Sequence, residues 1–312
     1  MTGHRPFRFS VQEHRARDAK HWREKAQAVE SMGYTTLYLP DHFNDQLGVI
    51  AALMAAADAT TKLRIGSLVF DNDYRHPVVL AKEAATLDLL SEGRLDLGVG
   101  AGWLASDYES AGIAYDSTGT RIERLEEALT ILKKCFTGQA FSFEGKHYTI
   151  KDFEGSPLPV QKPHPRFVLG GGGRRMLRLA AREGDIVHVN YNLNEGRVNP
   201  KLVQTGMAAA TDEKLVWIKE AAGERMEQIE LGFTVFFVNV TDDRDSLAEA
   251  MAPSMGFAAR DVLEMPHFLI GTIDQLEEDL KLRRDRYGFS DVIVPGEAAE
   301  QLSPLVERLA GK

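Results

Sequence analysis

A run of four glycines followed by two arginines, from Gly170 to Arg175, is the most distinctive chemical feature of the sequence. It lies between a predicted strand at Arg166–Leu169 and a predicted helix at Met176–Glu183. Glycines let the backbone approach a ligand closely, and the N–H groups at a helix N-terminus point toward negative charge. We therefore predict a phosphate-binding site, for which the alternative is a glycine-rich turn without a ligand. The predicted phosphate-binding residues are Gly170, Gly171, Gly172, Gly173 and Arg174.

A carboxylate and an imidazole stand next to each other directly after another predicted strand, in the sequence Pro40-Asp41-His42-Phe43. The ordinary pKa of histidine lies near neutrality, and a neighbouring carboxylate can orient the ring and bias its protonation. We predict that His42 and Asp41 are catalytic. A surface Asp–His pair in a loop is the alternative.

Two further strand ends carry residues that suit a flat ligand. Small residues from Gly98 to Gly102 would let a planar group lie against a barrel mouth, with Trp103 at its border. The run of polar residues after Phe70, from Asp71 to His76, would hydrogen-bond the edge of a heterocycle, or would simply cap a helix whose first residue is Pro77. The sequence leaves these two interpretations of the run open.

Short apolar runs alternate with helical patterns along the chain, which is typical of parallel βα units. The predicted strands are Phe7–Gln12, Thr36–Leu39, Arg64–Phe70, Leu95–Val99, Arg166–Leu169, Ile186–Val189, Glu230–Val238 and Asp291–Val294. The predicted helices are Ala19–Met32, Leu47–Ala59, Val78–Leu90, Ile122–Phe136, Met176–Glu183, Glu213–Ala222, Thr272–Tyr287 and Ala298–Leu309. Eight such units favour one domain over residues 1–312, folded as a (β/α)8 TIM barrel, with a doubly wound open sheet as the alternative.

Four irregular segments interrupt this rhythm. They cover residues 103–120, 151–165, 190–212 and 251–268, and a hairpin-like turn at Phe143–Lys146 lies before the second of them. The loops that follow barrel strands gather at the catalytic face. We therefore expect insertions at the C-terminal face of the barrel that form the walls of a substrate site.

Composition limits the classes of partner. The net charge of −9, the pI near 5.6 and the scattered lysines and arginines argue against binding to nucleic acid. The first residues lack the apolar core of a signal peptide, and no uninterrupted apolar run reaches the roughly 18 residues that a membrane span needs, so we expect a cytoplasmic protein without a membrane partner. We predict no metal, since His14 and His21 lack further ligands at metal spacing, and we interpret Cys135 as a buried apolar residue.

Taken together, several of these motifs resemble the bacterial luciferase-like flavin-dependent oxidoreductase superfamily. The motifs are Pro40–Phe43, His76-Pro77, Asp88 with Ser91–Arg94, Leu97–Trp103 and the glycine run. Similarity in order and spacing extends over nearly the whole chain, as far as Asp291–Pro295. Within the superfamily the chain looks like the actinobacterial branch that uses coenzyme F420.

The resemblance implies a luciferase-like barrel with a deazaflavin or flavin ring at its mouth. In relatives, a bulge with a non-prolyl cis peptide on the third strand lies behind this ring, and here the bulge would fall within Ser67–Val69. His42 matches the histidine that lies beside the reactive ring carbon in F420-using relatives. The cofactor-binding residues implied besides the glycine run are Ser67, Leu68, Val69, Asn72, Gly100, Ala101, Gly102 and Trp103.

The chain departs from the family pattern at two places. Trp103 stands where the F420-dependent sugar-phosphate dehydrogenases have a glutamate assigned to proton transfer, and Gln46 stands where they have a tryptophan. A tryptophan cannot transfer a proton. The departures disfavour sugar-phosphate oxidation and favour reduction of a conjugated or otherwise electron-poor organic substrate.

We therefore expect an F420-dependent oxidoreductase that transfers a hydride between the deazaflavin and a small organic substrate. The first alternative is an FMN-dependent monooxygenase that uses oxygen, and the second is a binding or storage protein without turnover. In either enzyme a separate flavin or F420 reductase would supply reduced cofactor. Substrate identity and oligomeric state stay open, with a homodimer the state often found among relatives.

Overall fold

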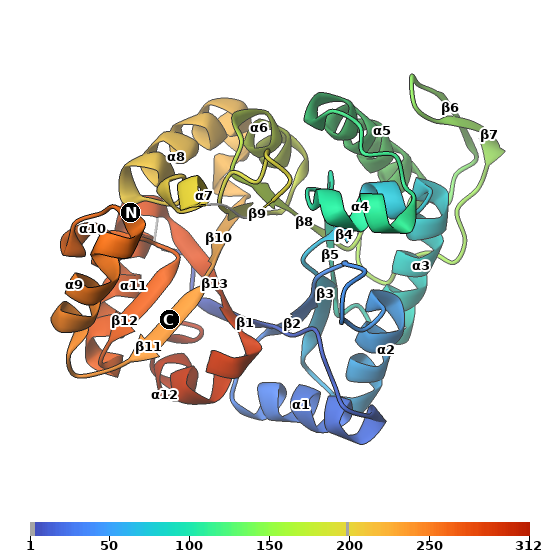
Figure 1. The fold of residues 1–312 in the computed structure, drawn as a ribbon. Helices are drawn as coiled ribbons and strands as arrows, with labels where there is room; N and C mark the ends of the chain where they lie inside the picture. The colour runs from blue at the N-terminus through green and yellow to red at the C-terminus, as the bar shows by residue number, and fades with distance from the viewer. Residues whose placement is uncertain (1–3, 198–199) are drawn as a thin grey trace.

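Eight parallel strands close into a barrel in the computed structural model, which describes residues 4–197 and 200–312 (Figure 1). The strands are β1 Arg8–Gln12, β2 Thr36–Leu39, β3 Arg64–Ser67, β5 Leu95–Gly100, β8 Arg166–Gly171, β9 Ile186–Val189, β10 Glu230–Thr234 and β13 Phe289–Pro295. They pair in this order around the ring, and β13 also pairs with β1. This arrangement confirms the predicted (β/α)8 TIM barrel and excludes the open sheet.

Helices surround the barrel, and each of the eight predicted helices is present (Figure 1). Their bounds are α1 Ala19–Ser31, α2 Val49–Ala59, α3 Pro77–Leu90, α5 Thr118–Cys135, α6 Arg174–Glu183, α8 Ala208–Ala222, α11 Ile273–Tyr287 and α12 Ala299–Leu309. Helix α5 begins earlier than predicted because the Ser117 hydroxyl accepts a hydrogen bond from the N–H of Thr120 and caps it. Gly33, Gly93 and Gly288 have positive φ angles, as expected for glycines that end helices.

Two predicted strands are shorter than expected. The strand predicted at Arg64–Phe70 is interrupted after Ser67 and resumes as β4, Phe70–Asp71. The peptide between Leu68 and Val69 is cis, which confirms the cis bond implied by the family resemblance. The strand predicted at Glu230–Val238 leaves the barrel after Val235, because the N–H of Phe236 donates to the carbonyl of His267 instead of to a barrel strand.

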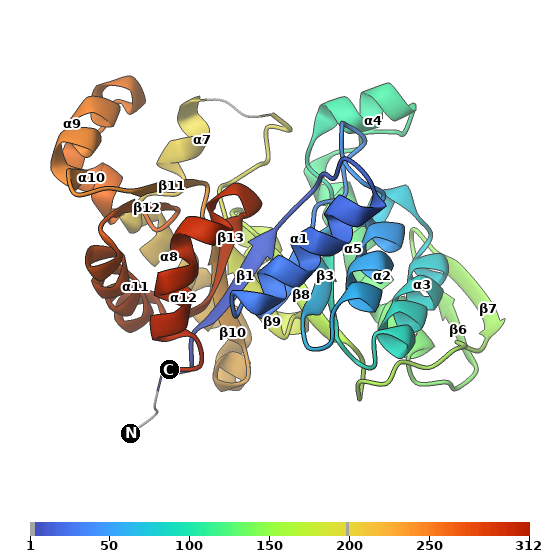
Figure 2. The same ribbon diagram turned by 90° about the horizontal axis from the view of Figure 1, so that it is seen from below.

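The insertions contain more regular structure than the sequence indicated. The predicted hairpin is present as β6 Phe141–Glu144 and β7 Thr149–Phe153. The elements that were not predicted are α4 Ala105–Ala111, α7 Pro200–Gln204, α9 Arg244–Met255, α10 Ala259–Glu264, and the pair β11 Phe237–Val240 and β12 Phe268–Gly271. Figure 2 shows α4, α7 and α9 at one end of the barrel, opposite the chain termini. In the described part of the chain, no helix combines the length and the apolar character that a membrane span requires.

One insertion does not reach the predicted substrate site. Residues 151–165 lead to the beginning of β8, and the side chain of Gln161 contacts Arg64 at the beginning of β3 and Asp88 on α3. This segment therefore lies at the end of the barrel where the strands begin. The expectation that it forms a substrate wall was wrong.

Ionised side chains fill the barrel where the strands begin. The carboxylate of Asp96 on β5 is fully buried and lies 2.7 Å from Nη2 of Arg64, 2.9 Å from Nη2 of Arg166 and 3.4 Å from Nη1 of Arg8. Burial by itself would raise the pKa of the Asp96 carboxyl, but the three guanidinium groups outweigh it and hold that pKa well below its ordinary value. Asp96 is therefore ionised, and its charge is shared among arginines from three other strands.

We predict that Asp96→Asn lowers the free energy of unfolding by about 3–5 kcal/mol, because three partly buried guanidinium groups would face a neutral amide. Urea denaturation measures this change. The matched control is Asp285→Asn, which removes a carboxylate that is 62% exposed and should change stability by less than about 0.5 kcal/mol.

The free energies of unfolding of wild type and Asp96→Asn should depend differently on pH. Because the fold lowers the pKa of Asp96, its stabilising contribution is present above the ordinary aspartate pKa of about 4 and is lost as the pH falls further. The difference in stability between wild type and Asp96→Asn should shrink in this acid range. A constant difference, or equal losses in Asp96→Asn and Asp285→Asn at neutral pH, would contradict the assignment.

Candidate active site

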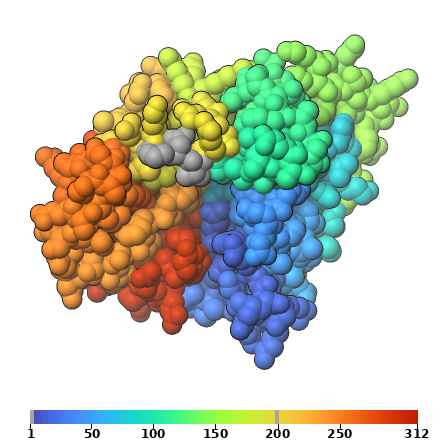
Figure 3. All heavy atoms as spheres, viewed as in Figure 1, coloured from blue at the N-terminus to red at the C-terminus, as the bar shows by residue number. Residues whose placement is uncertain are grey.

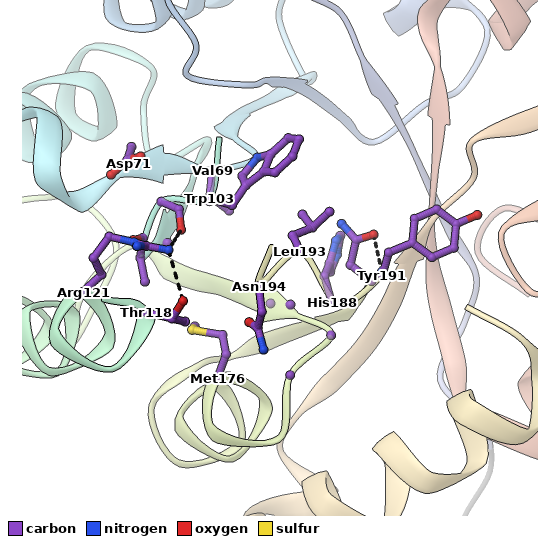
Figure 4. A pocket seen from close by; sticks show the side chains of 18 of the residues that line it. Val69, Asp71, Trp103, Thr118, Arg121, Met176, His188, Tyr191, Leu193 and Asn194 are labelled. Carbon is purple, nitrogen blue, oxygen red and sulfur yellow. Dashed lines mark hydrogen bonds between the residues drawn. The ribbon is translucent and has the colours of Figure 1, made fainter. Parts of the chain in front are cut away.

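A cavity opens at the end of the barrel where the strands finish. Figure 3 shows this face hollowed near its centre, and Figure 4 shows the side chains inside. Most residues that the sequence singled out line this one cavity. They are Asp41, His42, Leu68, Val69, Gly100, Ala101, Gly102, Trp103, Gly170, Gly171, Gly172 and Gly173.

Three side chains of the predicted cofactor site lie outside the cavity wall. The hydroxyl of Ser67 donates to the carbonyl of Gly98 at 2.6 Å, and the amide of Asn72 donates to the hydroxyl of Tyr148 at 3.1 Å. Arg174 is the first residue of α6, and its side chain is exposed. These three side chains make other contacts or face solvent, and their part in cofactor binding stays a prediction.

His42 follows β2, and its ring is held by two neighbours. Its Nδ1 lies 2.6 Å from Oδ2 of Asp107, a buried residue of α4. Trp103 packs edge-on against the imidazole, with ring centroids 5.8 Å apart and planes at 89°. A carboxylate can only accept, so Asp107 favours the tautomer with its proton on Nδ1 and leaves Nε2 for a ligand.

Asp107 is the carboxylate that contacts His42. The sequence had suggested Asp41 for this role. Oδ2 of Asp41 instead lies 2.6 Å from Nη1 of Arg75 and accepts the N–H of Asp71. Asp41 thus fixes the chain segment after β4. Asp107 could not be found from the sequence because α4 is short, and its one signal was the helix-ending Gly112.

The bulge after β3 forms one wall of the cavity and depends on two glycines of β5. A Cβ atom at Gly98 would overlap the carbonyl oxygen of Ser67, and one at Gly100 would overlap the side chain of Val69. Leu68 and Val69 themselves line the cavity. The glycines of β5 therefore serve close packing of the backbone against this wall.

A buried arginine lies at one end of the cavity. Arg121 of α5 is only 2% exposed, and Figure 4 shows it beside Thr118. Its guanidinium group donates only to neutral oxygens in these contacts. The acceptors are the carbonyl of Ala101 at 3.2 Å, the carbonyl of Asp116, and the hydroxyl of Tyr115 at 3.3 Å. A buried cation whose acceptors are neutral suits an anionic ligand. Arg121 was not predicted, because in the sequence it is one charge among several on an amphipathic helix.

The glycine run lies in the same part of the cavity. Gly170 and Gly171 end β8, and Gly173 is the N-cap residue of α6. A Cβ atom at Gly172 would overlap the backbone of Tyr191. The run and Arg121 both line this cavity, and together with the beginning of α6 they offer it backbone N–H groups and a cation. These features fit the phosphate of a cofactor.

The loop after β9 forms the cavity wall next to the glycine run. Asn190, Tyr191, Leu193 and Asn194 line the cavity (Figure 4). The buried ammonium group of Lys214 holds this loop by donating to the carbonyl of Asn190 at 2.7 Å, and burial lowers the pKa of Lys214 to about 8. The loop is thus anchored from α8.

A buried carboxyl group supports the turn at Gly102. Burial raises the pKa of Asp71 to about 7, although hydrogen bonds from the N–H of Asp73 and the Tyr108 hydroxyl oppose this shift. Gly102 has a φ of +72°, and a Cβ atom there would overlap both Tyr108 and Asp71. Close packing against Tyr108 and Asp71 therefore requires a glycine at this turn.

Nearly the whole chain matches a known protein family. A family model described as luciferase-like monooxygenase matches residues 4–293.

Two curated relatives are similar over part of the chain. An FMNH(2)-dependent dimethylsulfone monooxygenase from Pseudomonas putida is 31% identical over 169 residues, which cover 54% of this chain and 46% of the relative. An F420-dependent glucose-6-phosphate dehydrogenase from Amycolatopsis mediterranei is 27% identical over 230 residues, which cover 71% of this chain and 65% of the relative. The chain thus spans less than two thirds of the length of both.

A solved structure shares the fold. The coenzyme F420 dependent tetrahydromethanopterin reductase from Methanopyrus kandleri superimposes with a TM-score of 0.76 at 19% identity, over 98% of each chain. At this identity the likeness concerns the fold alone.

We predict that Gly100→Ala lowers the free energy of unfolding by about 1–3 kcal/mol, because the added methyl group would displace Val69 from the cavity wall. Thermal or urea unfolding measures the change. Gly48→Ala is the matched control, since a Cβ atom there meets no neighbour within 4 Å. Equal effects of the two substitutions would show that packing against the bulge does not constrain Gly100.

Proposed function

Since the chain belongs to the luciferase-like monooxygenase family, we propose that it is an oxidoreductase that uses coenzyme F420 and transfers a hydride between the deazaflavin and a small organic substrate. One observation carries the proposal. A single cavity is lined by a buried cation, a glycine run and a histidine whose ring is held by Asp107. These features suit a cofactor that has a phosphate and a redox-active ring.

The residues that would hold the phosphate are Gly170–Gly173, the first N–H groups of α6 and Arg121. Leu68 and Val69 would support the ring, with Gly100 and Ala101 beside them. When bound, F420 supplies the hydride chemistry, which no side chain can provide.

The contribution of the protein to the reaction is to place a proton. Hydride transfer to a carbonyl or a conjugated double bond leaves a second atom that needs a proton. His42 can supply it from Nε2 when both ring nitrogens carry a proton, because the Asp107 carboxylate at Nδ1 stabilises that imidazolium. After the transfer, the neutral ring keeps its proton on Nδ1. Trp103 keeps the imidazole edge in place and excludes water from one side.

An FMN-dependent monooxygenase is the second candidate. It is supported by the Pseudomonas putida relative, which uses FMNH2, and by the phosphate that both cofactors share. Under either proposal a separate reductase supplies reduced cofactor.

The proposal has three further parts. They are a homodimer, a cytoplasmic location and organisation as a single domain.

Cofactor binding tests the proposal directly. Titration of the purified protein with F420, followed by quenching of its fluorescence, should give a dissociation constant in the micromolar range or tighter, of about 10⁻⁶ M. Arg121→Met should weaken this binding by about tenfold to a hundredfold, because a charge-assisted hydrogen bond to phosphate is lost.

The ribityl deazaflavin without phosphate is the control ligand. Its affinity should be the same for wild type and Arg121→Met. If the variant loses affinity for both ligands, Arg121 acts by holding the loop at Ala101. Binding of FMN without binding of F420 would replace the first candidate by the second.

We predict that His42→Asn reduces turnover by about a hundredfold to ten-thousandfold and leaves cofactor affinity nearly unchanged, because the substitution removes the proton donor. Oxidation of reduced F420 by a panel of cyclic enones and ketones gives the rate. His21→Asn, on α1 outside the cavity, is the matched control and should keep the wild-type rate. Unchanged turnover in His42→Asn would remove His42 from the mechanism.

A further inference from the structure

A second histidine–carboxylate pair lies inside the barrel, separate from His42 and Asp107. His188 of β9 lines the cavity, and its Nε2 is 3.0 Å from Oδ2 of Asp291 on β13. Both residues are buried, with exposures of 3% and 0%. Figure 4 shows His188 beside Leu193 and Tyr191.

Asp291 determines which nitrogen of His188 carries the proton. Its carboxylate also accepts hydrogen bonds from Nη2 of Arg8 at 2.9 Å and from Oγ of Ser10 at 3.2 Å. Burial would raise the pKa of Asp291, but the charge of Arg8 and the hydrogen bond from His188 lower it. An ionised carboxylate has no proton to give, so Nε2 of His188 must be the donor.

The other nitrogen of His188 has no partner. Nδ1 is buried, and no hydrogen bond reaches it from the residues that the structure describes. With the proton on Nε2, Nδ1 of a neutral ring carries a lone pair. Buried acceptors are almost always paired, and each exception requires an explanation. Because His188 lines the cavity, the missing donor can come from a molecule that enters it.

The position of the ring is fixed by its neighbours. A Cβ atom at Gly170 would overlap the backbone of His188, and one at Gly232 would overlap its imidazole. Two glycines, one on each strand that flanks β9, thus make the space that the residue occupies. A ring held in this way and fixed by Asp291 is preorganised, so it need not be reordered when a ligand binds.

We propose that His188 is a positioning residue whose Nδ1 accepts a hydrogen bond from an N–H or O–H group of the ligand in this cavity. The inference rests on the proposed function, under which the ligand is a flavin or deazaflavin. Both rings contain a pyrimidinedione N–H, which is the donor that we assign to His188. A substrate hydroxyl offers the same chemistry, and the affinity measurements separate the two sources.

The tautomer of His188 is testable without any ligand. Two-dimensional ¹H–¹⁵N NMR of protein labelled with ¹⁵N-histidine should show His188 neutral, with the proton on Nε2 and an unprotonated Nδ1. Assignment uses the loss of this signal in His188→Gln. A proton on Nδ1 in the ligand-free protein would overturn the proposal, whatever cofactor the protein uses.

The affinity of the ligand tests the acceptor role. His188→Phe keeps a ring but removes the acceptor, and it should weaken binding of F420, or of FMN if that is the cofactor, by about tenfold. His188→Gln should retain part of the affinity, since its amide oxygen can accept a hydrogen bond, and it provides the test if His188→Phe does not fold. The matched control is His267→Phe, because His267 is also buried with one unpartnered nitrogen but does not line the cavity.

These affinity and KM measurements show which molecule carries the N–H or O–H group that donates to His188. Weaker cofactor binding places the donor on the cofactor ring. Unchanged cofactor binding with an increased KM places it on the substrate. No change in either value overturns the acceptor role. A wild-type protein that binds neither cofactor contradicts the proposed function instead, and the NMR measurement still decides the tautomer of His188.

Discussion

The closed barrel depends on the ion pairs that the buried carboxylate of Asp96 makes with three arginines. Arg8, Arg64 and Arg166 are the first residues of β1, β3 and β8, and all three direct guanidinium groups at Asp96 on β5. A buried carboxylate is costly unless cations and hydrogen bonds surround it, and these cations come from strands far apart in sequence. Since the network fills the end where the strands begin, the space for a ligand is at the other end.

The same network reaches the cavity. Arg8 contacts both Asp96 and Asp291, and Asp291 in turn accepts a hydrogen bond from His188. A side chain at the base of the barrel is thus connected to one at the cavity through a single carboxylate. The orientation of the His188 ring thus depends on a carboxylate that Arg8 also holds, since Nε2 has no other acceptor among the described contacts.

Aromatic rings pack against Tyr191 of the cavity wall, and a second, smaller apolar cluster supports them. The ring of Tyr191 stacks on Phe236 with centroids 4.8 Å apart, and its centroid lies 4.5 Å from that of His267. Burial lowers the pKa of His267 to about 3, so this ring is neutral and packs as an aromatic group. The cluster around Met265 lies behind these rings and comes largely from α9, α10 and β12. An uncharged organic group suits such a wall better than a charged one.

The repeating βα pattern, the glycine run and the position of His42 after a strand could all be predicted from the sequence, because each depends on residues that are close together in the chain. The cis peptide within Ser67–Val69 could be placed as well, although through family resemblance.

The partners of these groups became known only from the folded chain. Asp107 rather than Asp41 faces His42, Arg121 joins the glycine run, and Asp291 fixes His188, because barrel closure brings together side chains from distant strands and helices. Local pattern carries no information about such contacts, since they depend on which strand ends meet and on where each side chain points.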